Sequence, residues 1–378
     1  MTDFKKIAFA LTPTLGLFLL AECGARAVGT EECQAIEPDA GDWDTMQGDR
    51  ELLWSLVPNT EFKTGDDITR INAIGLREHL LPTERKKPKE KRIIVTGDSS
   101  IYGWGLRDNE TYAVVLEREL RGRFNVPIEV INLGVPGYST EQSIRLLNKI
   151  GWDYEPDLLI VSNIFSDCNI DAFQDETAFA LINPNDGPLS TALKKSRAYC
   201  AAYMPWVNYQ AKLNQQPNRV LMPGIPTGPN AAVTLENLNS TLNLSRVPLP
   251  KYLDNLSTLK SLAEAHAAQL MLAPLAQEWD VGIWNVPMPP PDEDHVLPWE
   301  PYRQAQKEWA TSHNVDLISF PEIFAASPVR KNELFLDNMH PSQKGAIVMA
   351  KAVAAHLQEH PERLGLTNAN RRGSGTPQ

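Results

Sequence analysis

Five short apolar runs recur along the chain, and polar or turn residues bound each of them. They lie at Ile93–Val95, Ile128–Leu133, Leu158–Val161, Leu270–Ala273 and Val315–Ile318. Continuous apolar runs of this length are typical of strands buried on both faces, as in parallel sheets. We therefore expect five strands to form the centre of one sheet.

Helical spacing of apolar residues follows several of these runs. The segments Thr111–Arg121, Thr140–Ile150, Leu253–Ala268 and Ser342–Leu357 each place apolar side chains on one helix face. Alternation of strands and helices favours a mainly parallel sheet with right-handed crossovers and helices on both faces. The sequence thus predicts an α/β fold, a three-layer α/β/α sandwich.

The same pattern divides the chain into segments. We expect a signal peptide or membrane anchor at 1–29, an acidic, turn-rich lead-in at 30–91 and the main domain at 92–360. Within the domain the alternation lapses at about 170–247, in a stretch rich in Asn and Pro that is more typical of an insertion than of a missed strand. Residues 361–378 are expected to form a flexible tail.

The N-terminus has the character of an export signal. Lys5 and Lys6 precede a mostly apolar stretch, Ile7–Ala21, which matches the positive region and short apolar region of such signals. Two cleavage sites compete, a lipoprotein-like box ending at Cys23 and the small-x-small pattern Ala25–Ala27, and an uncleaved anchor is a third alternative. We expect an exported protein, periplasmic or otherwise in the cell envelope, with membrane attachment through this segment left open.

The composition of the chain limits the classes of partner that the protein could bind. The chain has 378 residues and a net charge of −11, which argues against a nucleic-acid partner because phosphate binding needs clustered cationic surface. No spacing of Cys and His suggests a zinc site, so no metal is expected. Cys168 and Cys200 either form a disulfide or are buried free thiols, and the sequence leaves both alternatives open.

A serine lies where the first strand ends. Gly97-Asp98-Ser99 directly follows this strand, and ligands of open parallel sheets bind outside the carboxyl ends of the strands. A serine at such a turn can offer both its hydroxyl and its backbone N–H to a substrate. We expect Asp98 to tie this turn by hydrogen bonds rather than to react.

Two residues near the end of the domain complete a candidate triad. Asp337 and His340 are three positions apart and precede the last predicted helix. This spacing lets the carboxylate reach one imidazole nitrogen while the other nitrogen faces a nucleophile such as Ser99. A serine hydroxyl needs such a base and an orienting group, because by itself it is a poor nucleophile near neutral pH.

The order of these blocks resembles the SGNH, or GDSL-type, hydrolase superfamily over roughly Arg92 to Leu357. Gly97-Asp98-Ser99 matches its first block, Asp337-Asn338-Met339-His340-Pro341 its last, and Ile131–Ser139 its second. The resemblance implies a flavodoxin-like sheet, ester hydrolysis without a metal or organic cofactor, and an oxyanion hole to which Ser99 and Gly134 contribute backbone N–H groups.

The third block departs from the family pattern of Gly-x-Asn-Asp. With Asp167 as its final residue, Ile164 stands at the glycine and Ser166 at the asparagine that would donate to the oxyanion. Three alternatives are open: the Ser166 hydroxyl takes this role, the amide of Asn163 or Asn169 takes it, or the site is weakened. Loss of one oxyanion donor typically lowers the rate about 100- to 1000-fold.

These observations favour a serine esterase that acts on an oxygen ester, such as an O-acetylated carbohydrate, a lipid ester or another acylated small molecule. Two alternatives remain at this stage. One is an acyltransferase that moves acetyl groups onto envelope polysaccharide with the same triad. The other is a non-catalytic binding module that keeps the fold, motivated by the altered third block.

Overall fold

The structure is a computed structural model that describes residues 16–17, 19–30, 45–64, 67–169, 174–182, 192–203, 205, 233–234, 245–283, 295–296 and 299–372. Its centre is a parallel sheet of five strands in the order β11-β9-β7-β5-β6. These strands are β5 (Lys91–Thr96), β6 (Ile128–Asn132), β7 (Leu158–Val161), β9 (Gln269–Leu272) and β11 (Asp316–Leu317). All five predicted runs lie in this sheet, and the predicted fold class is confirmed.

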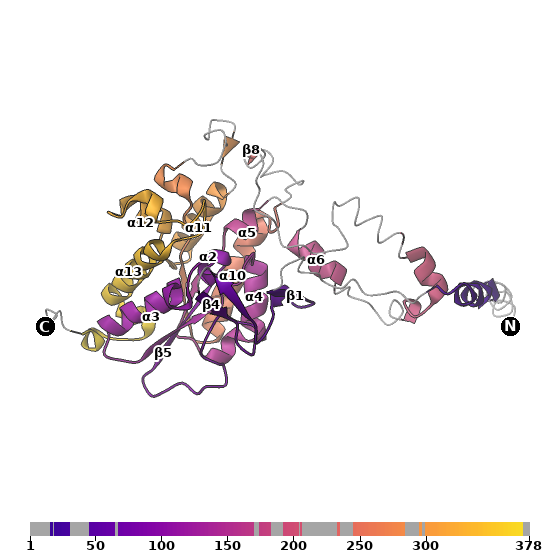
Figure 1. The fold of residues 1–378 in the computed structure, drawn as a ribbon, viewed down its shortest axis with the longest axis horizontal. Coiled ribbons are helices and arrows are strands. Elements are labelled where there is room, and N and C mark those ends of the chain that lie inside the picture. The colour runs from indigo at the N-terminus through magenta and orange to yellow at the C-terminus, as the bar shows by residue number, and fades with distance from the viewer. Residues whose placement is uncertain are drawn as a thin grey trace.

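Helices cover both faces of the sheet (Figure 1). They are α2 (Ser99–Tyr102), α3 (Tyr112–Arg123), α4 (Thr140–Lys149), α10 (Leu249–Ala265), α11 (Glu300–Ser312), α12 (Phe320–Ala326) and α13 (Gln343–Glu359). Helix α3 packs against α13, α4 packs against α10, and α10 also contacts α11. The two groups lie on opposite sides of the sheet, which gives the three layers of the predicted α/β/α sandwich.

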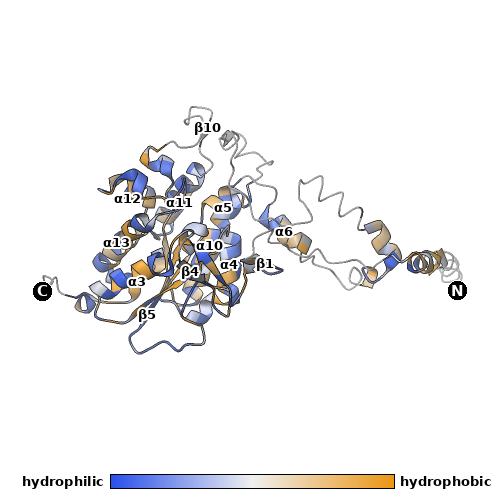
Figure 2. Ribbon diagram, viewed as in Figure 1, coloured by the Kyte–Doolittle hydropathy of each residue, from blue (hydrophilic) through white to orange (hydrophobic). Residues whose placement is uncertain are grey.

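The central strands are apolar because both of their faces are covered. Every residue of β7 is buried, and Ile93, Ile94 and Val95 of β5 have no exposed surface. The hydrophobic colouring in Figure 2 follows the same inner elements, with polar residues on the outer helix faces. Burial of this kind is the main favourable term that holds the sheet and helices together.

The lead-in segment before β5 forms two antiparallel hairpins. Strand β1 (Met46–Asp49) pairs with β2 (Leu53–Leu56), and β3 (Glu61–Thr64) pairs with β4 (Asp67–Arg70). The first hairpin places Trp54 in the core with no exposed surface. After the second hairpin, the buried Arg77 donates to Gly103 O at 2.7 Å and to Leu106 O at 2.6 Å. The lead-in therefore packs directly against the end of α2.

Most of the predicted insertion at about 170–247 lies outside the described residues. Its described parts include α6 (Asp175–Ile182) and β8 (Val233–Thr234), which pairs with β10 (His295–Val296). The two stems of the insertion meet at the sheet, because Arg246 N donates to Asn169 O at 3.0 Å and Asp175 N donates to Arg246 O at 2.9 Å.

Part of the predicted tail, 361–378, lies against the domain in the structure. The chain forms two 3₁₀ turns, η5 (Pro361–Leu364) and η6 (Asn368–Asn370), and Leu364 is fully buried. Arg372 N then donates to Arg123 O at 2.7 Å at the end of α3. Apolar residues and these backbone bonds hold the tail on the domain, whereas 373–378 lie outside the described residues.

The cysteines do not pair as Cys168 with Cys200. Cys168 is a free thiol, buried at the end of α5 (Phe165–Cys168), whereas Cys200 is disulfide-bonded. At the N-terminus, the first fifteen residues of the expected signal lie outside the described ones. Of the helices that the structure describes, none is long and apolar enough to cross a membrane.

Candidate active site

The serine turn is built from a helix cap and a close backbone approach. Asp98 caps α2, and its Oδ1 accepts the N–H of Ser100 at 2.9 Å, as expected from the sequence. A side chain at Gly97 would lie 2.6 Å from Cγ1 of Ile101, so only glycine lets α2 fold back so tightly. Burial raises the pKa of Asp98 to about 6. The carboxyl group stabilises the turn through its hydrogen bond with Ser100 N. Ser99 is thus held at the carboxyl end of β5.

Ser99, His340 and Asp337 form one hydrogen-bonded chain. The Ser99 hydroxyl lies 2.8 Å from Nε2 of His340, and Nδ1 of His340 lies 2.6 Å from Oδ2 of Asp337. Burial works to raise the pKa of Asp337, but the hydrogen bond and charge attraction of His340 outweigh it and hold that pKa below its usual value. The carboxylate can therefore orient the imidazole and stabilise its protonated form.

The loop that carries the acid and the base is closed by backbone hydrogen bonds. Leu336 N donates to His340 O at 2.8 Å, and Ser342 N donates to Leu334 O at 2.9 Å. Asp337 Oδ1 also accepts the N–H groups of Met339 and His340 at 2.9 and 2.8 Å. These bonds fix the position of both functional side chains before α13 begins.

Two contacts join this loop to the serine turn. Ser100 Oγ donates to Met339 O at 3.4 Å, which links the loop to α2 directly. The indole ring of Trp104 stacks on the imidazole of His340, with 6.0 Å between ring centroids and 30° between ring planes. Trp104 thus lies beside the imidazole, and sequence reasoning missed it because no motif marks an aromatic residue at this spacing.

The assignment of Gly134 as an oxyanion donor does not fit the structure. Its N–H donates to Oδ1 of Asn132 at 2.9 Å and is therefore engaged within the turn after β6. A side chain at Gly134 would lie 2.4 Å from the backbone N of Tyr102. Glycine is needed here so that the turn can pack against the backbone of α2, not to offer a donor to substrate.

Gly137, three residues further on, has a different environment. Val135–Tyr138 forms a turn closed by Tyr138 N donating to Val135 O at 3.1 Å, with Gly137 at a φ of 76°. Within Leu133–Thr140, Gly137 has the one N–H without an acceptor among the described residues. This turn adjoins the serine turn, since Val135 N donates to Gly97 O at 3.2 Å.

The residues of the third block differ in whether their side chains form hydrogen bonds to the described residues. The Asn163 amide is fully buried and committed, because Nδ2 donates to Tyr138 O at 3.0 Å and Oδ1 accepts the Ser143 hydroxyl at 3.0 Å. It is therefore not available to a substrate oxygen. Ser166 retains 8% of its exposure, and its hydroxyl makes no hydrogen bond to the described residues. Asn169 contributes its backbone carbonyl to the insertion stem.

Asp167 links the third block to the second. Its Oδ1 accepts both the N–H and the hydroxyl of Thr140, at 2.9 and 2.5 Å. Burial raises the pKa of Asp167 to about 7, against the opposing effect of these hydrogen bonds. Asn255 of α10 also donates to the Thr140 hydroxyl at 2.9 Å. Asp167 thus holds the start of α4 and has no exposed surface through which to meet a substrate.

A buried ion pair, missed at the sequence level, lies behind the Gly137 turn. Arg246 and Asp175, from the two stems of the insertion, have side chains that are 0% and 1% exposed and bond at 2.9 Å. Arg246 also donates to Gly137 O at 2.6 Å. No local sequence pattern marks this pair, because its members are 71 positions apart and meet only when the insertion stems close.

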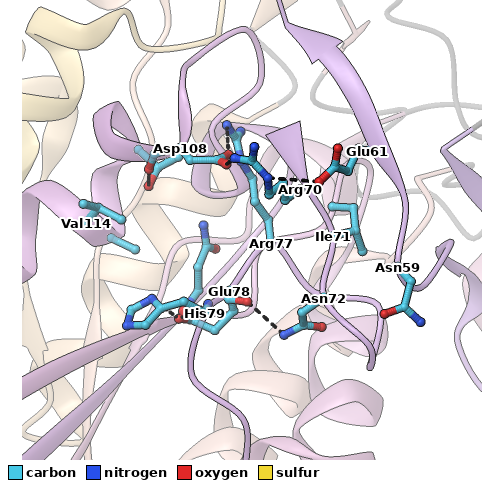
Figure 3. Close-up of a pocket in the computed structure, with 13 residues that line it drawn as sticks. Asn59, Glu61, Arg70, Ile71, Asn72, Arg77, Glu78, His79, Asp108 and Val114 are labelled. Atoms are coloured by element: carbon cyan, nitrogen blue, oxygen red, sulfur yellow. Dashed lines mark hydrogen bonds and ion pairs between the residues drawn. The ribbon is translucent and has the colours of Figure 1, made fainter. Parts of the chain in front are cut away.

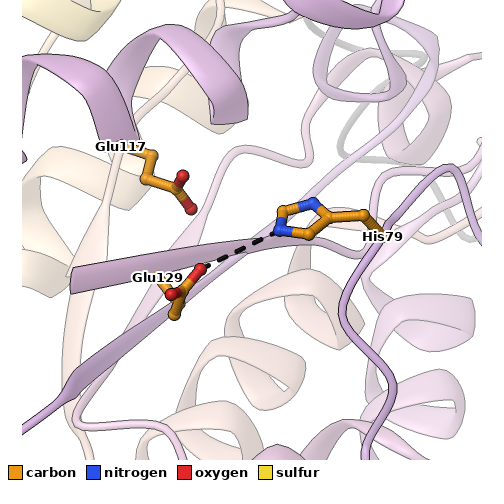
Figure 4. A group of neighbouring side chains, drawn as sticks. All are labelled: His79, Glu117 and Glu129. Carbon is orange, nitrogen blue, oxygen red and sulfur yellow. Dashed lines mark ion pairs between the residues drawn. The ribbon is translucent and has the colours of Figure 1, made fainter. Parts of the chain in front are cut away.

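One group of side chains has the composition of a metal site. His79, Glu117 and Glu129 bring ligand atoms within 4.8 Å of one another (Figure 4). Arg121 already pairs with Glu117 at 2.9 Å and with Glu129 at 2.8 Å. The hydrogen bond to Glu78 raises the pKa of His79 to about 9. A protonated imidazole and an arginine fit an ion-pair network better than they fit a cation site.

A cavity of about 500 Å³ lies between the second hairpin of the lead-in and α3 (Figure 3). Its lining includes Arg70, Arg77, Glu78 and Asp108 but none of the three residues of the hydrogen-bonded chain. The charges compensate one another, because Arg77 pairs with Asp108 at 2.9 Å and Arg70 pairs with Glu61 at 3.0 Å. Because none of the three residues lines it, this cavity is separate from the candidate active site.

The chain is similar to several known proteins. Among solved structures, the chain is similar to the acetylxylan esterase Axe2 of Geobacillus stearothermophilus (13% identity, TM-score 0.41, 73% of this chain and 95% of that chain). It is also similar to the lipase/acylhydrolase of Enterococcus faecalis (14% identity, TM-score 0.42, 71% and 96%). No curated protein is similar enough to be matched.

The amino-acid sequence also matches a known protein family. Residues 95–346 match the model of the GDSL-like lipase/acylhydrolase family. The match spans both the serine turn at Ser99 and the loop with Asp337 and His340, and it covers most of the sheet. The chain belongs to the GDSL-like lipase/acylhydrolase family of ester-hydrolysing enzymes.

Proposed function

We propose that the protein is a serine esterase in which Ser99 is the nucleophile, His340 the general base and acid, and Asp337 the residue that orients His340. The observation that carries this proposal is the continuous hydrogen-bonded chain from Ser99 Oγ through His340 to Asp337, with links of 2.8 and 2.6 Å. Each link has the length that proton transfer and orientation require.

The reaction has two stages. Ser99 Oγ attacks the acyl carbon while its proton passes to Nε2 of His340, which then gives that proton to the leaving alcohol as the ester bond breaks. Water next attacks the acyl-serine, again giving a proton to Nε2. That proton returns to Ser99 Oγ as the carboxylic acid leaves, and the enzyme is restored.

The developing oxyanion would be bound by the N–H groups of Ser99 and Gly137. Gly137 replaces Gly134 in this role because its N–H has no acceptor among the described residues, whereas that of Gly134 is bonded to Asn132. The hydroxyl of Ser166 would be the third donor, in place of the amide expected there. Donors that are already aimed at the oxyanion lower the barrier without reorganisation.

The substrate that we propose is an oxygen ester of the cell envelope, either an O-acetylated carbohydrate or a lipid ester. This proposal rests on an expected location outside the cytoplasm, which the lysine-led apolar N-terminus favours. A disulfide-bonded Cys200 suits an oxidising compartment as well. Fractionation of cells that produce the full chain would test the location, and recovery from the cytoplasm alone would contradict it.

A fluorophosphonate probe tests the catalytic proposal. We expect wild type to be labelled at Ser99 and to hydrolyse p-nitrophenyl acetate, and we expect Ser99→Ala to do neither while keeping its melting temperature. Ser261→Ala is the matched control, because it removes a hydroxyl on the exposed face of α10. Equal hydrolysis by wild type and Ser99→Ala would rule out this mechanism.

A further inference from the structure

Two side chains from outside the Ser99–His340–Asp337 chain form hydrogen bonds to the turn that contains Gly137. The indole Nε1 of Trp54 donates to the carbonyl oxygen of Pro136 at 3.0 Å, in a buried position. The guanidinium of Arg246 donates to the carbonyl oxygen of Gly137 at 2.6 Å. Both carbonyls that flank the N–H of Gly137 along the chain are therefore held by a named donor.

The bond from Trp54 determines where the Gly137 N–H points. Pro136 C=O and Gly137 N–H belong to one planar peptide unit, and no peptide bond of the described residues is cis. In a trans unit the C=O and the N–H point in opposite directions. A carbonyl bonded to Trp54 on one side thus fixes the N–H of Gly137 on the side away from Trp54.

Arg246 is itself held from several directions. It is fully buried, and it bonds both carboxylate oxygens of Asp175, at 2.9 and 3.1 Å, and Oε1 of Gln142 at 2.7 Å. Its guanidinium carbon lies 5.2 Å from the centre of the Trp54 ring, so the side chains of Arg246 and Trp54 also contact each other. The planar, multiply bonded guanidinium leaves the turn little freedom.

We propose that Trp54 and Arg246 are positioning residues that hold the N–H of Gly137 as a preorganised oxyanion donor. The inference rests on the proposed esterase function and extends it, because it ties the lead-in hairpin and the base of the insertion to the reaction. Neither residue touches the substrate: Trp54 acts through the Pro136–Gly137 peptide, and Arg246 acts through the next peptide, Gly137–Tyr138. Reorienting the Pro136–Gly137 peptide would weaken binding of the transition state more than binding of the ester itself.

Trp54→Phe removes the indole N–H and keeps an aromatic ring. Trp152→Phe is its matched control, because Trp152 Nε1 donates to Asn148 Oδ1 at 3.3 Å, at the far end of α4. With p-nitrophenyl acetate, we expect Trp54→Phe to lower kcat on the order of 10- to 100-fold at unchanged KM. Trp152→Phe should keep the wild-type kcat.

Arg246→Lys tests the hydrogen bond to Gly137 O, since lysine keeps the charge but cannot form the same set of bonds. Arg92→Lys is its matched control: Arg92 is a buried arginine that bonds Glu90 at 2.6 Å and Tyr154 O at 3.1 Å. It lies near the start of β5, whereas Ser99 lies beyond its end. Arg246→Lys should lower kcat and slow labelling by the fluorophosphonate probe, whereas Arg92→Lys should affect neither.

Three measurements separate positioning from general loss of structure. They are the division of the effect between kcat and KM, the rate of fluorophosphonate labelling and the melting temperature of each variant. A kcat equal to that of the controls, a rise in KM alone, or a loss that follows melting temperature across all four variants would overturn the inference and leave the esterase proposal standing. Undiminished hydrolysis by Ser99→Ala would overturn both.

Discussion

The hydroxyl of Ser99 lies 2.8 Å from Nε2 of His340 although the two residues are 241 positions apart in the chain. Ser99 begins α2 at the end of β5, and His340 lies in a loop that backbone bonds close just before α13. The contact therefore depends on the packing of α13 over the sheet and not on any local segment. The bond between His340 and Asp337 sets the orientation of the imidazole, and the bond from Gly134 N to Asn132 fixes the neighbouring turn after β6.

Replacing the carboxylate of the chain should weaken catalysis without unfolding the protein. We expect Asp337→Asn to lower kcat roughly 1000-fold or more, because an amide no longer stabilises the protonated imidazole and favours the wrong tautomer. The measurement is steady-state hydrolysis of p-nitrophenyl acetate. Asp316→Asn is the control, since Asp316 pairs with His356 at 2.9 Å away from Ser99. Equal activity of the two variants would contradict the role of Asp337.

Substitutions at Ser166 can both remove and restore a hydrogen-bond donor in the third block. If the Ser166 hydroxyl binds the oxyanion, Ser166→Ala should lower kcat on the order of 10-fold or more, and Ser166→Asn should restore a donor there. Ser261→Ala on the exposed face of α10 controls for loss of a hydroxyl. The readout is kcat with p-nitrophenyl acetate, and a wild-type kcat for Ser166→Ala would exclude the hydroxyl as a donor.

Two glycines should respond oppositely to the same substitution. Gly134→Ala would place its new carbon 2.4 Å from the backbone N of Tyr102, so we expect a loss of about 2 kcal/mol or more in unfolding free energy, with lower activity. Gly122→Ala in α3 meets nothing within 4 Å and should stabilise the helix by about 0.5–1 kcal/mol. Urea unfolding measures both, and equal effects would contradict the close approach at Gly134.

Asp167 should make stability depend on pH. Its folded pKa is raised from 3.8 to about 7, so the folded state binds this proton more tightly than the unfolded state. Its contribution is complete below about pH 4 and is lost as pH rises towards 7. Asp167→Asn removes this titration and keeps an oxygen for Thr140.

Urea midpoints at pH 5 and pH 8 test this dependence. The difference between the two midpoints should be smaller for Asp167→Asn than for wild type, because the variant has lost one group that favours the folded state at low pH. Asp254→Asn, at an exposed position of α10, should follow wild type. Parallel behaviour of wild type and Asp167→Asn would contradict the raised pKa.

Much of the fold could be predicted because its signals are local. The apolar run Leu158–Val161 becomes β7 with the same bounds, and the run beginning at Ile128 becomes β6. Strands buried on both faces need apolar residues at every position, so the pattern is visible without knowledge of the neighbours. The run at Val315–Ile318 produced only the two-residue β11, at one edge of the sheet.

The oxyanion donors could not be predicted in the same way. Gly134 and Gly137 look alike in sequence, but one N–H is bonded to Asn132 and the other has no acceptor among the described residues. Asn163 has the right chemistry for a donor, yet its amide is committed to Tyr138 and Ser143. Availability of a donor depends on every hydrogen bond around it, and these bonds form only when the chain is folded.

By itself, the sequence determined the α/β alternation, the serine at the first strand end and the Asp337–His340 spacing, because each depends on residues close together in the chain. Only the tertiary structure decided which glycine N–H is available, that Cys168 stays a free thiol, and that Trp54 and Arg246 meet at the Gly137 turn. The physical reason is that hydrogen-bond partners far apart in sequence are selected by packing, and no local pattern records that selection.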